Sequence, residues 1–176
     1  VMEESWLIIP MGSYVIKEAV LCCCRLKKVI PLFHMNINLS YVQLKKSDVL
    51  QELRNHLGVA EVCLENIMLE ITESGYIETD PAFRKAMEEI CGQKLRLAID
   101  DFGTGYSALN LLKELEFDIL KLDGSFVSGA AAEGYKSDVI LRNIIRMADE
   151  LYMTVLCEGL ETAGQVERLN TFGCTL

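Results

Sequence analysis

The sequence predicts an α/β fold built around a parallel sheet. Short apolar runs alternate along the chain with longer amphipathic segments, and each apolar run ends in a polar residue. Strands that alternate with helices in this way form parallel sheets with right-handed crossovers. The 176 residues include only 3 Pro and 12 Gly, and neither a linker nor a low-complexity stretch interrupts the pattern. One domain is therefore expected.

Each element is predicted from its periodicity and from residues that begin or end helices. Ser13 is a favourable N-cap for the first helix, and Asp48 with Gln51 three residues later resembles a capping box. Asp80 followed by Pro81 combines an N-cap with a first-turn proline. The expected elements are helix 13–27, strand 32–39, helix 48–58, strand 67–72, helix 80–92, strand 95–99, helix 107–115, strand 119–123, helix 137–151, strand 153–157 and helix 163–171.

Composition excludes several classes of function. The chain carries 17 Lys and Arg against 26 Asp and Glu, a formal net charge of -9, so DNA or RNA binding is not expected. An acidic chain that binds a phosphorylated ligand needs metal ions to bridge the like charges. The longest apolar run, residues 19–24, is far shorter than the roughly 20 residues of a membrane span, and the acidic start is unlike a signal peptide. A cytoplasmic location is expected, with any membrane anchor in another domain of the parent protein.

Other residue types carry little functional signal. There are 7 Cys, three of them consecutive at Cys22–Cys24, without the spacing of a metal or disulfide framework. They are expected to be reduced, small apolar residues. His34 and His56 lie apart without ligand spacing and are expected to be structural.

Polar residues end five successive predicted strands. Because the carboxyl ends of parallel strands meet at one edge of the sheet, where α/β proteins bind ligands, these side chains are expected to converge. A buried strand has no reason to end in a carboxylate unless something offsets the cost of desolvation, and cations would do so. The five residues are Asn38, Glu70, Asp100, Lys121 and Glu158.

Each of these positions also has a simpler interpretation. Asp100 and Asp101 precede a glycine-containing loop, where aspartates commonly cap helices or form turns. Lys121 is costly to bury unpaired, so it needs an anionic partner unless its side chain extends to solvent. The remaining alternatives are an edge-strand surface position for Glu70, an internal backbone-bonded amide for Asn38, and a helix N-terminus stabilised by Glu158 and Glu161.

The motifs together resemble, in order and spacing, the bacterial EAL domain. The resemblance covers nearly the whole chain and implies a (β/α)8 TIM-like barrel with one antiparallel strand, of which about five βα units are present. It also implies a cyclic di-GMP phosphodiesterase that produces linear pGpG. The motifs are Asn38-Leu39-Ser40, Leu69-Glu70-Ile71-Thr72-Glu73-Ser74, Asp100-Asp101-Phe102-Gly103-Thr104-Gly105-Tyr106-Ser107, Lys121-Leu122-Asp123, Ser125-Phe126-Val127 and Glu158-Gly159-Leu160-Glu161-Thr162.

The same resemblance implies two sites for Mg²⁺ or Mn²⁺. Asn38, Glu70 and Asp100 would bind the first ion, and Asp100, Asp101 and Glu158 the second, with the attacking water between them. Two-metal sites of this kind activate water and neutralise an anionic diester.

Further roles follow from the resemblance. Lys121 would orient or deprotonate the water, Asp123 would support it, and Glu158 completes the catalytic set. Glu73 would anchor the loop Asp101–Ser107, which in the family lies at a homodimer interface, and Glu161 is a second loop-anchoring candidate.

The sequence also departs from the family pattern. The Glu-Ala-Leu tripeptide is absent, and Gly124 replaces a usually longer residue. Residues 1–176 are therefore expected to be a partial EAL domain that lacks the first strands and the last. Such a piece, expressed alone, is expected to be inactive and to self-associate. The parent protein is expected to carry fused sensor or cyclase domains. The alternative function is a degenerate or truncated EAL domain that binds cyclic di-GMP or a partner protein without catalysis.

Overall fold

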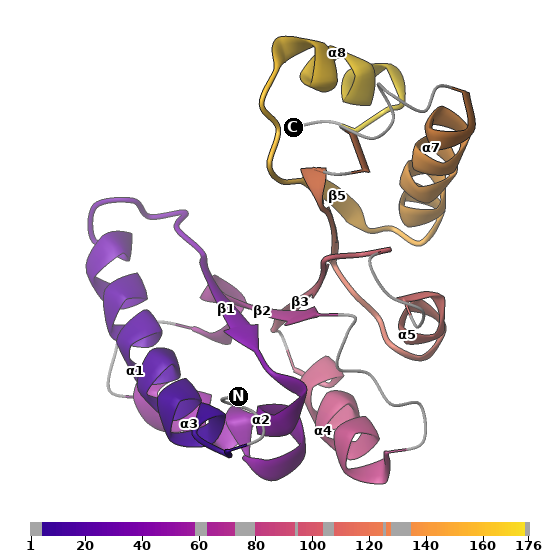
Figure 1. Ribbon diagram of the computed structural model, residues 1–176. Helices are drawn as coiled ribbons and strands as arrows, with labels where there is room; N and C mark the ends of the chain where they lie inside the picture. Colours follow the sequence, from indigo (N-terminus) through magenta and orange to yellow (C-terminus); the bar gives the residue numbers. More distant parts are fainter. Residues whose placement is uncertain are drawn as a thin grey trace.

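The computed structural model describes residues 5–58, 63–72, 80–93, 95–103, 108–124, 126–127 and 135–174. Helices alternate with strands along the chain (Figure 1). The elements are α1 (Ile8–Lys27), β1 (Met35–Leu39), α2 (Tyr41–Lys46), α3 (Val49–Leu57), the 3₁₀ turn η1 (Leu64–Asn66), β2 (Ile67–Thr72), α4 (Pro81–Cys91), β3 (Arg96–Asp100), α5 (Ala108–Glu114), β4 (Ile119–Leu122), α7 (Tyr135–Glu150), β5 (Thr154–Cys157) and α8 (Ala163–Thr171).

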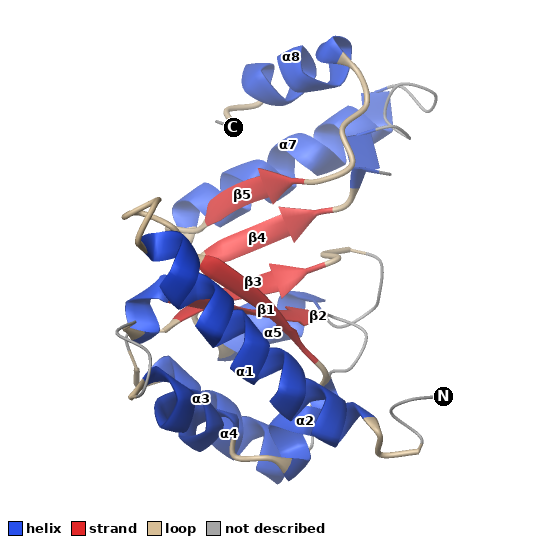
Figure 2. Cartoon of the chain, turned by 90° about the vertical axis from the view of Figure 1, so that its left-hand side faces the viewer, coloured by secondary structure: helices blue, strands red, loops and turns tan. Residues whose placement is uncertain are grey.

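The five strands form one parallel sheet in the order β1-β2-β3-β4-β5. Figure 2 shows β3, β4 and β5 side by side and pointing the same way. This confirms the predicted parallel α/β fold. The spatial order follows the chain order, as in a (β/α) barrel, whereas a doubly wound sheet reverses direction partway across. The register pairs Asn38 with Glu70 and Thr72 with Asp100, so the strand ends are level with one another.

The two faces of the sheet differ in chemistry. Alternate residues of each strand, such as Ile37 and Leu39 on β1, are buried in the apolar core. Helices α1, α4, α5 and α7 lie around the outside of the curved row of strands (Figure 1). The intervening residues, including Asn36 and Asn38, face the opposite side and are exposed on β1. The candidate site residues belong to this second set.

The start of α1 differs from the prediction. The helix begins at Ile8 rather than Ser13, and Pro10 lies in its first turn, where the missing N–H has no intrahelical partner to lose. Ser13 is therefore inside the helix and is not its N-cap. Its hydroxyl instead contacts the Glu52 carboxylate, 2.9 Å from both oxygens, and joins α1 to α3.

Helix α2 was not predicted, although its capping signal is in the sequence. Ser40 Oγ accepts a hydrogen bond from the Gln43 N–H, and the Gln43 side chain accepts one from the Ser40 N–H. The buried Gln43 packs against Gly12 of α1, where a Cβ would lie 1.6 Å from Gln43 Nε2. Strand β1 is shorter than residues 32–39, and the other elements match their predicted bounds within two residues.

None of the described helices is long and apolar enough to cross a membrane.

Asp80 joins the start of α4 to α2. Its Oδ1 accepts from the N–H groups of Ala82 and Phe83, while Oδ2 accepts from the Tyr41 hydroxyl at 2.7 Å and pairs with Lys45 Nζ at 2.5 Å. The Lys45 ammonium, followed by the Tyr41 hydroxyl, holds the pKa of Asp80 well below its usual range.

We expect Asp80→Asn to lower the Tm of the protein at neutral pH, because the amide keeps the cap and loses the charge. A lowered carboxyl pKa stabilises the fold above the unfolded-state value of about 3.9, and this contribution disappears as the pH falls through the lower folded-state pKa. The difference from wild type should therefore shrink in acid, as followed by thermal melts between pH 7 and pH 2. Asp48→Asn is the control, because Asp48 caps α3 through the Gln51 N–H. Equal Tm changes in the two variants would contradict the role of the Asp80 charge.

Candidate active site

The Lys121 ammonium lies among three carboxylates from three different strand ends. Lys121 Nζ, on β4, is 3.0 Å from Glu70 Oε2 on β2 and 3.0 Å from Asp100 Oδ1 on β3. It is also 2.9 Å from Glu158 Oε1, directly after β5. The side chains of Lys121, Glu70 and Asp100 are 6%, 4% and 15% exposed, whereas Glu158 is 51% exposed. The structure thus brings together four of the five predicted strand-end residues in direct contact.

Burial and charge act in opposite directions on Lys121. Burial alone would lower its pKa, but hydrogen bonds to Glu158, Glu70 and Asp100 raise the pKa above its ordinary value. Lys121 is therefore a cation at neutral pH. The alternative in which its side chain extends to solvent is wrong, and so is the edge-strand position for Glu70, because β2 lies between β1 and β3.

Two amides of β1 face the same side of the sheet. Asn38 lies opposite Glu70 in the β1–β2 register and is exposed, rather than internal. Asn36, two residues earlier, donates from Nδ2 to Glu70 Oε1 at 2.8 Å. Asn36 was missed in the sequence because it does not end a strand. The signal that reveals it is the period of two that places it on the same face as Asn38.

Asp101 follows β3 in the left-handed region, with φ 54°, which aspartate tolerates better than most residues. Its N–H donates to Asp100 Oδ1 at 3.1 Å, and the next N–H, of Phe102, donates to the Lys121 carbonyl at 3.1 Å. Burial, then the charges of Asp100 and Asp123, raise the pKa of Asp101. The turn that was the simpler interpretation of Asp100 and Asp101 is thus present. It also places the Asp101 carboxylate near the charges of Asp100 and Lys121.

The remaining predicted residues follow β4 and β5 in the chain or lie outside the described part of it. Asp123 directly follows β4 and is half-buried. Glu161 is exposed beside Thr162, the N-cap of α8, and its N–H donates to Gln165 Oε1 at 2.7 Å. Glu73 and residues 104–107 of the predicted loop are outside the described residues.

Gly124 allows the segment that carries Glu158 to approach the end of β4. A Cβ at Gly124 would lie 2.7 Å from the carbonyl oxygens of both Glu158 and Gly159, closer than real side chains approach. The Glu158 N–H donates to the Leu122 carbonyl at 3.0 Å. The absence of a side chain at position 124, a departure from the family pattern, therefore fits the path of the backbone at Glu158.

We expect Gly124→Ala to destabilise the protein by about 1–3 kcal/mol, the usual cost of overpacking against atoms that cannot move aside. The control is Gly164→Ala on α8, where a Cβ meets nothing within 4 Å and helix propensity favours alanine. Urea denaturation of both variants measures the difference. Equal stabilities would contradict the close approach at Gly124.

The donor atoms of the cluster are those that hard divalent cations prefer. Carboxylate and amide oxygens bind Mg²⁺ and Mn²⁺, and here three carboxylates already surround a positive charge. Within the described ranges, no three Asp, Glu, His or Cys side chains are grouped so as to hold a metal ion, and the carboxylates of the cluster pair with the Lys121 ammonium. The chemistry of the residues therefore fits divalent cations that share these carboxylates with Lys121.

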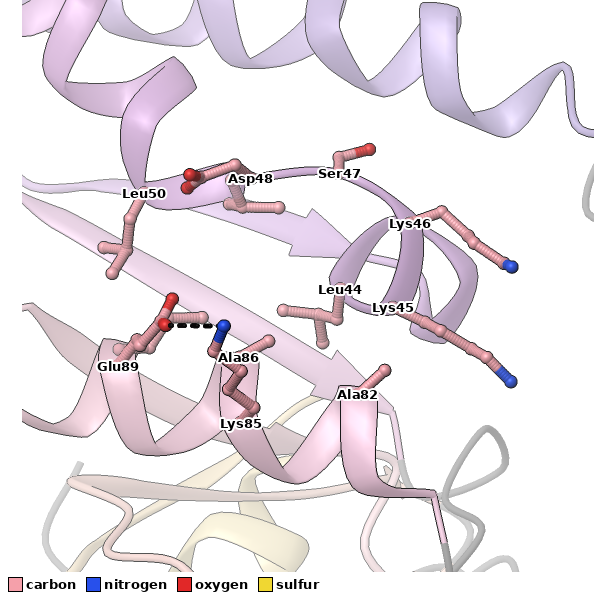
Figure 3. A pocket seen from close by; sticks show the side chains of 12 residues that line it. Leu44, Lys45, Lys46, Ser47, Asp48, Leu50, Ala82, Lys85, Ala86 and Glu89 are labelled. Carbon is pink, nitrogen blue, oxygen red and sulfur yellow. Dashed lines mark ion pairs between the residues drawn. The ribbon is translucent and has the colours of Figure 1, made fainter.

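A separate pocket of about 330 Å³ lies on the outside of the sheet, between α2, the start of α3 and α4 (Figure 3). Lys85 pairs across one turn with Glu89 at 3.8 Å, while the ammonium groups of Lys45 and Lys46 point away from the pocket. The strand-end residues do not line this pocket. It is therefore distinct from the carboxylate cluster.

Comparison with known sequences gives a consistent result. The family model described as EAL domain matches residues 1–176. MucR from Pseudomonas aeruginosa, named a bifunctional diguanylate cyclase/cyclic di-GMP phosphodiesterase, is 30% identical over 98% of this chain and 25% of its own length. PdeA from Borreliella burgdorferi, named a cyclic di-GMP phosphodiesterase, is 36% identical over 70% of this chain and 18% of its own. The chain spans between 18% and 33% of the length of such curated relatives.

Solved structures confirm the predicted fold class. The EAL enzyme Bd1971 in its cAMP and cyclic di-GMP bound form has a TM-score of 0.90 and 28% identity, over 98% of this chain and 48% of that one. The MucR phosphodiesterase in complex with c-di-GMP has a TM-score of 0.83 and 29% identity, over 98% and 70%. BlrP1 from Klebsiella pneumoniae, a manganese and cyclic di-GMP complex, has a TM-score of 0.77 and 29% identity, over 92% and 42%.

Proposed function

Because the chain belongs to the EAL domain family, we propose that the protein hydrolyses cyclic di-GMP to linear pGpG with the help of divalent cations, Mg²⁺ or Mn²⁺. The observation that carries this proposal is the group of three carboxylates, from three strand ends, around the Lys121 ammonium. Relatives named as cyclic di-GMP phosphodiesterases, and a similar structure that holds manganese with the dinucleotide, support it.

The strand-end residues supply the donors for two cations in this proposal. Asn38, Glu70 and Asp100 would hold one ion, and Asp100, Asp101 and Glu158 would hold the other, with Asp100 common to both. Such ions lower the pKa of bound water and neutralise the charge of the diester. Burial, and then the charges of Asp100 and Asp123, raise the pKa of Asp101, and a bound cation would offset the repulsion among these carboxylates.

Lys121 acts on the attacking water through Nζ. Hydrogen bonds to three carboxylates raise the pKa of Lys121, so in this arrangement it is a protonated donor to those oxygens. Its Nζ becomes available to orient the water, or to accept its proton, only when other cations share those carboxylates. Asp123 supports Lys121 from the end of the same strand.

The proposal includes the surroundings of the site. Glu73 and Glu161 anchor the loops beside it, and residues 101–107 form a homodimer contact. The longer relatives, one of which combines cyclase and phosphodiesterase functions in its name, support fusion to sensor or cyclase domains in the parent protein. In this proposal the domain lies in the cytoplasm, with any membrane anchor in another domain of the parent protein.

The decisive experiment is a hydrolysis assay with the purified full-length parent protein, because residues 1–176 alone are expected to be inactive or nearly so. We expect cyclic di-GMP to be converted to pGpG in Mn²⁺ or Mg²⁺, and we expect EDTA to abolish the conversion, as followed by anion-exchange chromatography. Undiminished turnover in EDTA would contradict the role of the cations. Dinucleotide binding without cleavage in Mn²⁺ would instead identify the protein as a binding module.

A further inference from the structure

Asn36 contacts the carboxylate cluster but belongs to none of the motifs that resemble the family. Its Nδ2 donates to Glu70 Oε1 at 2.8 Å, while the other oxygen of Glu70, Oε2, lies 3.0 Å from Lys121 Nζ. The Glu70 side chain is 4% exposed, so solvent has little part in holding it. Each oxygen of this carboxylate therefore has its own donor, one neutral and one charged.

The sheet register shows from which direction Asn36 approaches Glu70. Asn38 is the residue opposite Glu70, and Asn36 is opposite Met68, two residues earlier on both strands. Asn36 thus lies on the same face as Asn38 but farther from the carboxyl ends of the strands. Asn36 does not bond the other oxygen of Glu70, Oε2. That oxygen pairs with Lys121, which also pairs with Asp100 and Glu158.

We propose that Asn36 is a positioning residue that fixes which oxygen of Glu70 faces the cation site, an inference that rests on the proposed function. A group that hydrogen-bonds a metal ligand from behind sets the orientation of that ligand, and its loss typically costs 10- to 100-fold in metal affinity. An uncharged amide suits this role because it holds Oε1 without adding a positive charge that would repel the ion.

A merely structural role for Asn36 makes a different prediction. If its amide only satisfied a buried carboxylate, its removal would lower the stability of the protein and leave the free carboxylate to bind cations as well or better. A positioning role lowers cation affinity by more than the change in stability accounts for, because Asn36 itself is exposed and Glu70 keeps Lys121 as its charged partner through Oε2. Affinity and stability must therefore be measured on the same variants.

The test uses Asn36→Leu, which removes the donor at similar size, and Asn36→Gln, which retains an amide. Asn110→Leu, at an exposed position of α5, is the control. Mn²⁺ binding is measured from the electron paramagnetic resonance signal of free Mn²⁺, and the Tm is measured in EDTA. We expect Asn36→Leu to raise the Kd for Mn²⁺ by about 10- to 100-fold, more than any loss of Tm relative to Asn110→Leu accounts for. Asn36→Gln should recover part of the affinity.

Several results would overturn the inference. If the wild type binds Mn²⁺ and Asn36→Leu has the same Kd, Asn36 has no positioning role, and the proposed function is unaffected. An Asn36→Leu protein that fails to fold, or an affinity loss that follows the loss of Tm across all variants, shows a structural role instead. A wild-type protein that does not bind Mn²⁺ overturns the proposed function together with this inference.

Discussion

Replacing Lys121 with methionine should strongly destabilise the protein in EDTA and make its Tm depend on divalent cations. Methionine keeps the unbranched apolar stem of the lysine and removes the ammonium. In the wild type, one nitrogen, Lys121 Nζ, lies within 3.0 Å of an oxygen of Glu70, Asp100 and Glu158. The three carboxylates are therefore close to one another. Without the ammonium, three carboxylates face one another without a counter-charge, two of them largely buried.

Removing one partner of a buried ion pair costs about 3–5 kcal/mol, and the lower end applies here because Glu158 is half-exposed and its charge is screened by solvent. For a chain of this size that loss lowers the Tm by on the order of 10 °C. Because the pKa of Lys121 is raised, the wild-type contribution is fully present below the ordinary lysine pKa near 10.4 and is lost only as the pH rises through the folded-state value.

Mn²⁺ should recover most of the lost Tm, because an ion that binds only the folded state stabilises it in proportion to the logarithm of its concentration over Kd. Thermal melts in EDTA and in a Mn²⁺ series measure both effects. Lys113→Met, at an exposed position of α5, is the matched control. Its Tm in EDTA and the response of its Tm to Mn²⁺ should both equal those of the wild type. A Lys121→Met protein as stable in EDTA as this control would show that the ammonium does not neutralise the cluster.

The sheet was predictable because its signals are local. Each strand is an apolar run, and helices such as α4 begin at a cap, Asp80-Pro81, that can be read directly from the chain. The strand-end cluster was predictable for a topological reason: in a parallel sheet, residues that end successive strands must lie at one edge. The sequence did not reveal which groups pair, and the sharing of Lys121 by three carboxylates depends on side-chain rotamers.

The differences have physical causes as well. Serine is a favoured cap, so the sequence predicts that α1 starts at Ser13, but the helix begins at Ile8 and Pro10 is tolerated in its first turn. Helix α2 has only 6 residues, too few to show a helical hydrophobic period, although its Ser40–Gln43 capping box is visible in the sequence. Asn36 went unnoticed because nothing in the chain marks its contact with Glu70, which is distant in sequence.

In the full-length parent protein, replacing Asp100 with asparagine should reduce the hydrolysis of cyclic di-GMP by at least about a hundredfold, because altering even a hydrogen-bond partner of a metal ligand costs 10- to 100-fold. Asp100 is proposed to hold both cations, and an amide of the same shape supplies one neutral oxygen in place of a shared charge. The protein should still fold, because Lys121 retains Glu70 and Glu158 as partners. Asp149→Asn, at an exposed position of α7, is the control.

The Asp100→Asn variant also separates catalysis from stability. Its Tm in EDTA should lie well above that of Lys121→Met, because one negative charge has been removed and the positive charge remains. The pKa of Asp101, which the Asp100 charge raises after burial, should fall toward its ordinary value, as carboxyl NMR can follow. Turnover within a few-fold of the Asp149→Asn control in the same Mn²⁺ buffer would mean that the cations do not share Asp100. The two cation sites would then have to be assigned to the other carboxylates.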